Sequence, residues 1–130
     1  MSAPNQVSLC IDIPLIAAGT DEDRYAVHGW PGEWQLSHAY LTPAAATTAH
    51  AANYTTIELK NGAGTVLGSL NTSTGSGAAF VEGTAQRFTL TGGAALEFGN
   101  ADAINIEKSD SGAGGLLDCS VTLSFTKIHV

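Results

Sequence analysis

The stretch TTIELKNGAGTVLGSL, residues 55–70, decides the fold class. Thr55, Ile57 and Leu59 alternate with polar residues, which is the period-2 pattern of a strand that is buried on one face. Asn61-Gly62 follows directly, and this dipeptide favours a type I′ hairpin turn because both residues tolerate a positive φ. Residues 65–70 read as the returning strand. The stretch therefore predicts an antiparallel hairpin.

The same alternation recurs along the chain, whereas no segment keeps a 3.6-residue period. Six further segments read as strands: 7–17, 25–30, 34–41, 86–91, 103–107 and 116–128. Turn dipeptides such as Pro31-Gly32 and Gly92-Gly93 separate them. The alanine-rich residues 43–52 favour a loop over a helix, because they have no apolar stripe. About eight short strands predict an all-β fold, an antiparallel β-sandwich or barrel.

The length of 130 residues is close to the commonest size of a single domain. We expect residues 1–130 to form one β-domain, with residues 1–6 as a short polar N-terminal arm. The Gly-rich residues 62–80 fit a turn, a strand and a short loop better than a disordered linker. The alternation predicts that these residues face the core: Ile57, Leu59, Phe88, Leu90, Ile104, Ile106, Val121, Leu123 and Phe125.

Charge and hydropathy exclude several classes of partner. The chain has 5 Lys and Arg against 12 Asp and Glu, a net charge of -7, which disfavours binding to nucleic acid or to an anionic membrane. It contains no apolar run long enough to span a bilayer. Its first residues lack the positive segment of a secretory signal. We therefore expect no nucleic-acid and no membrane partner.

The residues that carry chemistry are sparse and badly spaced for catalysis. Asp21-Glu22-Asp23 lacks the spacing of a calcium loop and is typical of a solvated corner. His28 and His38 fit rim residues better than metal ligands, and the chain has no Gly-x-Ser-x-Gly motif. We expect no enzyme activity, no cofactor and no tightly bound metal.

The two cysteines are expected on different faces of their strands. Cys10 alternates out of phase with the apolar residues of its strand, whereas Cys119 is in phase with Leu117 and Val121. We expect no disulfide between them and a buried Cys119.

The N-terminal strand and one pair of tryptophans are the candidate interface. Residues 7, 9, 11, 13 and 15 are all apolar and form the longest alternating face, which gives a terminal strand an edge to offer to a partner. Trp30 and Trp34 flank the Pro31-Gly32 turn, either as a sugar-stacking platform, as part of a protein interface or packed against each other. The candidate contact residues are Val7, Leu9, Ile11, Ile13, Trp30 and Trp34.

Five segments together resemble a known family. They are Tyr40-Leu41, AANYTTIELKNG (51–62), GAAFVEGTAQRFTL (77–90), NADAINIEK (100–108) and GLLDCSVTLSF (115–125). In this order they are similar to small β-sandwich virion proteins of tailed bacteriophages, of the head decoration or cement type. Those proteins often carry Gly-Asp where this chain has Ala101-Asp102, so the turn there is expected to differ.

The resemblance implies a jelly-roll-like sandwich and a non-enzymatic role. It implies that the protein is made in the host cytoplasm and stabilises the outside of a capsid in the virion. Its implied partners are the major capsid protein and further copies of itself in a homotrimer. The alternative is a carbohydrate-binding or fibre-associated adhesion module that uses Trp30, Trp34, Tyr40 and acidic loop residues.

Overall fold

The computed structural model describes residues 5–128. Residues 1–4 of the expected arm lie outside the described residues, and Gln6 already belongs to the first strand. The elements are β1 (Gln6–Ile16), β2 (Glu22–His28), β3 (Trp34–Pro43), β4 (Tyr54–Asn61), β5 (Val66–Asn71), β6 (Gln86–Arg87), the 3-10 helix η1 (Gly93–Leu96), β7 (Glu97–Phe98), β8 (Asp102–Ser111) and β9 (Leu117–Lys127).

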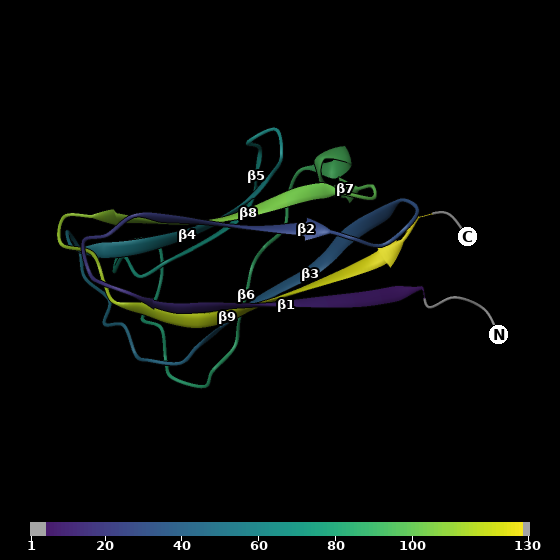
Figure 1. The fold of residues 1–130 in the computed structure, drawn as a ribbon. Coiled ribbons are helices and arrows are strands. Elements are labelled where there is room, and N and C mark those ends of the chain that lie inside the picture. Colours follow the sequence, from purple (N-terminus) through teal and green to yellow (C-terminus); the bar gives the residue numbers. More distant parts are fainter. Residues whose placement is uncertain (1–4, 129–130) are drawn as a thin grey trace.

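The strands form two antiparallel sheets that pack face to face (Figure 1). One sheet has the order β1-β9-β3-β6, with β7 also pairing with β3, and the other has the order β2-β8-β4-β5. Successive strands alternate between the sheets from β1 to β4, and the last two strands alternate again. This order is that of a jelly roll. The predicted all-β sandwich is therefore confirmed.

The core lies between the sheets and is built from the inward positions of the strands. Phe125, Leu123 and Ile57 have 0% of their surface exposed. Of the nine predicted core residues, eight are buried, and Leu90 is half-buried and packs against them. Segments outside the long strands add Phe80 and Phe98 to the core. The predicted inward face is confirmed.

The prediction for the end of β1 is wrong. Leu15 is 63% exposed, whereas Ile16 takes the core position and is 3% exposed. The register with β9 shifts between Ile13 and Ile16. Pro14 lies within this shift, and because it has no N–H, it is compatible with an edge strand or a bulge rather than with a continuous ladder. The bulge reverses the alternation.

The β4–β5 hairpin is confirmed, but its turn is not the two-residue type I′ turn that Asn61-Gly62 favours. The backbone N–H of Asn61 bonds the carbonyl of Thr65 at 3.1 Å. The Asn61 side-chain Oδ1 accepts hydrogen bonds from the N–H groups of Ala63 and Thr65. The positive φ of +87° falls at Gly64 instead of Gly62. The side chain of Asn61 thus organises a longer turn.

The predicted strand 86–91 is also shorter than expected, because only Gln86 and Arg87 pair with β3 as a strand. The N–H of Phe88 still bonds the carbonyl of Ala39, whereas that of Thr91 bonds the carbonyl of Leu67 on β5. This segment therefore crosses from one sheet to the other. The crossing buries Phe88 between the two sheets.

Candidate interaction surface

β1 has one edge that no other described strand pairs with. On its other edge it pairs with β9 from Gln6↔Thr126 to Ile13↔Cys119. The N–H of Lys127 bonds the carbonyl of Asn5 at 2.8 Å, so the odd-numbered residues of β1 are those that exchange hydrogen bonds with β9. The backbone groups of residues 6, 8, 10 and 12 therefore point away from β9. They form a row of donors and acceptors that fits an added strand.

The same strand carries apolar side chains that the fold covers only in part. Val7, Leu9 and Ile11 point toward the core but are half-buried. The reason is their position, since β1 and β2 are the outer strands of their sheets and lie opposite each other (Figure 1). Asp12 is the one charged residue in β1, so the strand has no lysine and no inward charge to block pairing.

The structure divides the six candidate contact residues into two groups. Ile13 and Trp34 are 1% and 4% exposed and belong to the core, so they offer almost no surface to a partner of the folded chain. Trp30 is half-buried and packs on Phe125 with ring centroids 5.8 Å apart, and Phe125 is the register partner of Val7. We call residues 6–12 of β1 together with Trp30 the edge surface.

The two tryptophans belong to an aromatic cluster around His28. Trp30 and Trp34 have ring centroids 6.3 Å apart, and the Nε1 of Trp34 donates to the carbonyl of Pro31 at 2.9 Å. The ring of His28 lies 4.8 Å from that of Trp30 and 4.7 Å from that of Phe125. Of the three alternatives for the tryptophans, packing against each other is therefore what the structure shows. Tyr40 lies apart from them, beside His38.

His28 is an unusual member of this cluster because it is 1% exposed and neither ring nitrogen has a hydrogen-bond partner within residues 5–128. Burial lowers the pKa of His28, and the nearby backbone of Gly99 and the charge of Asp102 only partly oppose this effect. His38 lies on an exposed part of β3, where its Nδ1 is 3.0 Å from an Arg87 nitrogen. The two histidines are therefore not brought together as metal ligands.

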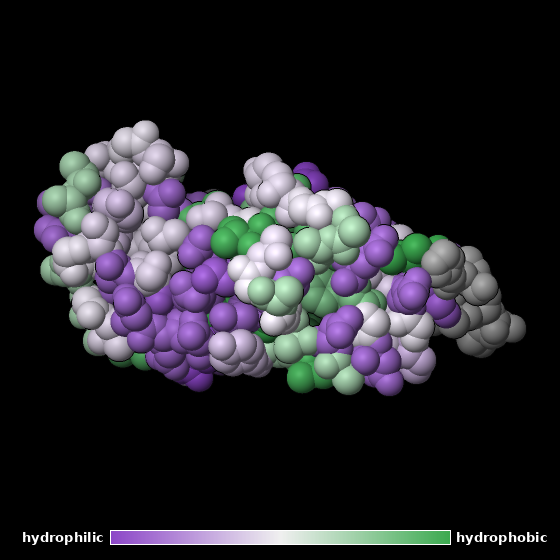
Figure 2. All heavy atoms as spheres, turned by 90° about the horizontal axis from the view of Figure 1, so that it is seen from above, coloured by the Kyte–Doolittle hydropathy of each residue, from purple (hydrophilic) through white to green (hydrophobic). Residues whose placement is uncertain are grey.

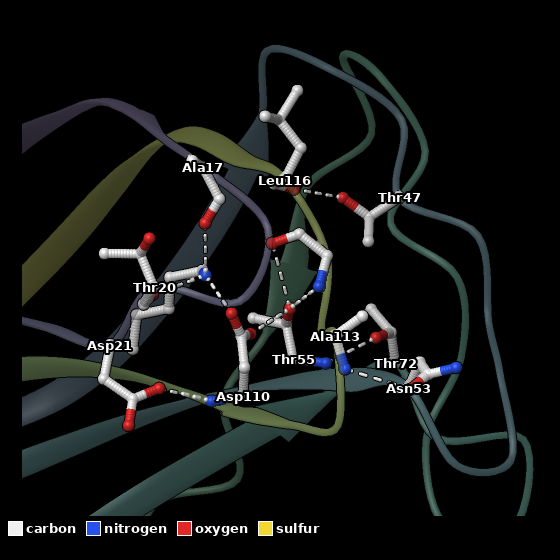
Figure 3. A network of polar contacts seen from close by, with 12 residues as sticks. Ala17, Thr20, Asp21, Thr47, Asn53, Thr55, Thr72, Asp110, Ala113 and Leu116 are labelled. Carbon is white, nitrogen blue, oxygen red and sulfur yellow. Dashed lines mark hydrogen bonds and ion pairs between the residues drawn. The ribbon is translucent and has the colours of Figure 1, made fainter.

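A buried ion pair between Lys108 and Asp110 lies at the other end of the β2–β8 ladder from His28. Figure 3 shows the polar contacts around Asp110. The Lys108 Nζ donates to Asp110 Oδ2 at 2.5 Å and to the carbonyls of Ala17 at 3.2 Å and Thr20 at 2.8 Å. Both side chains of the pair are 2% exposed. Asp110 Oδ1 in turn accepts a hydrogen bond from the Thr55 hydroxyl at 2.7 Å. Three acceptors hold the ammonium group, so it acts as a structural cation rather than a nucleophile.

Further hydrogen bonds connect this pair to the surrounding turns. Asp21 Oδ1 accepts from the N–H of Asp110 at 2.7 Å, and the Asn53 side chain accepts from the N–H of Ala113 at 2.9 Å (Figure 3). Gly114 is required there, because a Cβ on it would lie 2.0 Å from the Asp110 side chain. Asp21 thus has a specific structural role that its acidic neighbourhood did not indicate. One feature of the sequence pointed to this cluster. Lys108 occupies the next inward-facing position of the strand after Ile104 and Ile106, where a charged residue is unexpected.

The remaining chemistry of the surface is limited. Within residues 5–128, no group of three or more His, Cys, Asp or Glu side chains is arranged to hold a metal ion. In the same part of the chain, no helix has the length and apolar character to cross a membrane. Cys10 is exposed, and Cys119 is buried as predicted. The edge surface is therefore the strongest candidate for function.

Comparison of the chain with models of protein families, with curated proteins and with solved structures finds no match.

Proposed function

We propose that this chain is a non-enzymatic structural protein of a phage virion, which binds and stabilises the outside of the capsid through its edge surface. The observation that carries the proposal is the unpaired edge of β1, with four residues whose backbone groups point outward. An added strand from the major capsid protein satisfies these groups, and its side chains cover Val7, Leu9 and Ile11. The resemblance of five segments to decoration proteins supports the same role.

The charge of the chain fits this location. A net charge of -7 keeps the protein away from packaged nucleic acid, and it limits aggregation between decorated particles. β1 itself carries one charge, so the repulsion does not act at the proposed contact. The protein binds as a homotrimer, because threefold symmetry repeats one weak contact without forming open fibres. Three linked contacts raise the overall affinity through effective concentration.

The test is binding of the purified protein to capsids that lack it. The decisive variant is Cys10→Pro, since the N–H of residue 10 points away from β9 and its loss removes no bond within the fold. We expect this variant to stay folded and to lose saturable capsid binding. The wild type should raise the melting temperature of the capsid by mass action. Sedimentation of the free protein measures whether it is a trimer.

Leu9→Pro is the matched control for this experiment. Residue 9 exchanges hydrogen bonds with Leu123 of β9, so proline there breaks the ladder and should destabilise the domain itself. Capsid binding that persists in a folded Cys10→Pro variant would refute the edge as the contact. A monomer that ignores capsids but binds glycans would instead favour the adhesion alternative.

A further inference from the structure

The outer face of the β2-β8-β4-β5 sheet has a small hollow in which three different side chains meet. Figure 2 looks onto this layer and shows polar residues interspersed with apolar ones. Tyr25 on β2 and Lys60 on β4 are both register partners of Asn105 on β8, so the three lie side by side across the sheet. They line a hollow of about 120 Å³ together with Ala103 and the β4–β5 turn.

Asn105 is the unexplained residue of this row. It is 9% exposed, although its neighbours Ile104 and Ile106 show that it lies on the outer side of the sheet. Its Oδ1 is buried and has no hydrogen-bond partner among the described residues. An unpaired buried amide oxygen destabilises a fold, because its desolvation is not compensated. A valine at this position would suit a central strand better.

The other lining residues suit recognition of a ring-shaped ligand. Tyr25 is 68% exposed, so its ring is available for stacking. A second hollow of about 240 Å³ adjoins the first at Asn61, Gly62 and Ala103, and Asp102 and Glu97 line its far side. An aromatic ring, two amides and carboxylates therefore lie along the two adjoining hollows.

The charges around the hollow restrict the ligand. The Lys60 Nζ bonds Glu107 at 2.9 Å, and this bond together with the charges of Glu107, Glu58 and Asp23 raises the pKa of Lys60. Lys60 thus stays protonated with its charge balanced by Glu107, and the surrounding acids repel phosphates, nucleic acids and acidic sugars. The lining combines the apolar ring of Tyr25 with the polar side chains of Asn61 and Asn105. It therefore suits a neutral molecule that has hydroxyl groups for the amides and an apolar face for the ring.

We propose that this hollow is a binding site for a neutral saccharide, with Tyr25 stacking on the sugar ring and the Asn105 side chain, which lines the hollow, turning its unpaired amide oxygen toward a hydroxyl group of the sugar. The site lies on the sheet face and not at the free edge of β1, so sugar binding is independent of capsid binding. A virion protein with both surfaces would hold the capsid by one and a glycan by the other. The saccharide source is either a bacterial surface polysaccharide or an animal mucin glycan.

The test is an NMR titration of the isotope-labelled protein with methyl glucoside, methyl galactoside, mannose and N-acetylglucosamine. Concentrations to about 20 mM detect a Kd on the order of 1 mM. We expect shift changes confined to the side-chain amide of Asn105, Tyr25 and the Asn61–Gly64 turn with at least one sugar. A glycan array with bacterial polysaccharides and mucin glycans on separate spots then distinguishes the two sources.

Three variants make the test specific. Tyr25→Ala should weaken binding about tenfold. Asn105→Val should abolish binding and yet melt at a higher temperature than the wild type, because it removes the unpaired amide oxygen. Tyr40→Ala, on the other sheet, should bind as the wild type does. Shift changes with none of the four sugars, or binding that survives in Asn105→Val, would overturn the proposal whether or not the protein binds capsids.

Discussion

Replacement of Lys108 by methionine should remove a large part of the stability of the domain. The substitution keeps a long apolar side chain but deletes the ammonium group that bonds Asp110 and the carbonyls of Ala17 and Thr20. The Asp110 side chain is 2% exposed, and among the described residues its carboxylate then keeps only the hydrogen bond from the Thr55 hydroxyl. Removing one partner of a buried ion pair costs about 3–5 kcal/mol, out of a total stability of about 5–15 kcal/mol.

This cost can be converted into a melting temperature. An unfolding entropy of about 2.1 cal/mol/K per residue gives about 0.27 kcal/mol/K for 130 residues. A loss of about 4 kcal/mol therefore corresponds to about 15 °C. Urea and thermal unfolding followed by circular dichroism measure both quantities. The matched control is Lys60→Met, which breaks the more exposed Lys60–Glu107 pair on the outer face of the same sheet and should change stability much less.

The double variant Lys108→Met with Asp110→Asn completes the experiment. It removes the uncompensated charge and should recover part of the lost stability. Equal losses for Lys108→Met and Lys60→Met would refute the reasoning, since burial would then make no difference. A double variant as unstable as Lys108→Met alone would show that the carbonyl contacts, and not the ion pair, carry the effect.

Three further predictions concern the core, the acid range and the thiols. Phe125→Ala should lower stability by about 3–5 kcal/mol, because the side chain is 0% exposed; an unchanged urea midpoint would contradict its position. Burial lowers the pKa of His28, so the unfolded state binds its proton first and stability should fall as the pH drops below about 6.5. His28→Leu should lack this part of the pH dependence, and parallel profiles for the two proteins would rule out His28 as its source. Burial raises the pKa of Cys119 to about 12, so a thiol reagent at about pH 8 should modify Cys10 in the folded protein and both cysteines only in denaturant.

The sequence predicts the layers of this fold well because strand alternation reports burial directly. The inward faces of β4, β8 and β9 follow from Ile57, Ile104 and Phe125 with their neighbours. The face of Leu15 does not follow, since one proline-associated bulge reverses the phase of a strand. The type of the β4–β5 turn cannot be read from the sequence either, because the hydrogen bonds of the Asn61 side chain depend on where the returning strand lies.

The candidate sites were only partly predictable from the sequence, because they depend on which strands the fold places next to each other. The edge surface was visible as an alternating N-terminal strand, but whether Ile13 or Val7 stays uncovered depends on the strand opposite them. The row of Tyr25, Asn105 and Lys60 joins three segments far apart in the chain, and only the register between β2, β8 and β4 brings them together. The two carbonyl partners of Lys108 come from the β1–β2 turn, which no local pattern connects to β8.

The pairing of β1 with β9 also determines how the domain responds to mechanical load. The start of β1 and the end of β9 lie side by side, where the N–H of Lys127 bonds the carbonyl of Asn5. A tension applied between these two points pulls the strands apart across the ladder, so their bonds rupture one after another and resist little. A force that enters along β1 and leaves along β3 acts parallel to the strands. It loads many hydrogen bonds of the β1–β9 and β9–β3 ladders at once. The domain should therefore be weak when pulled by its ends and strong as a lateral brace.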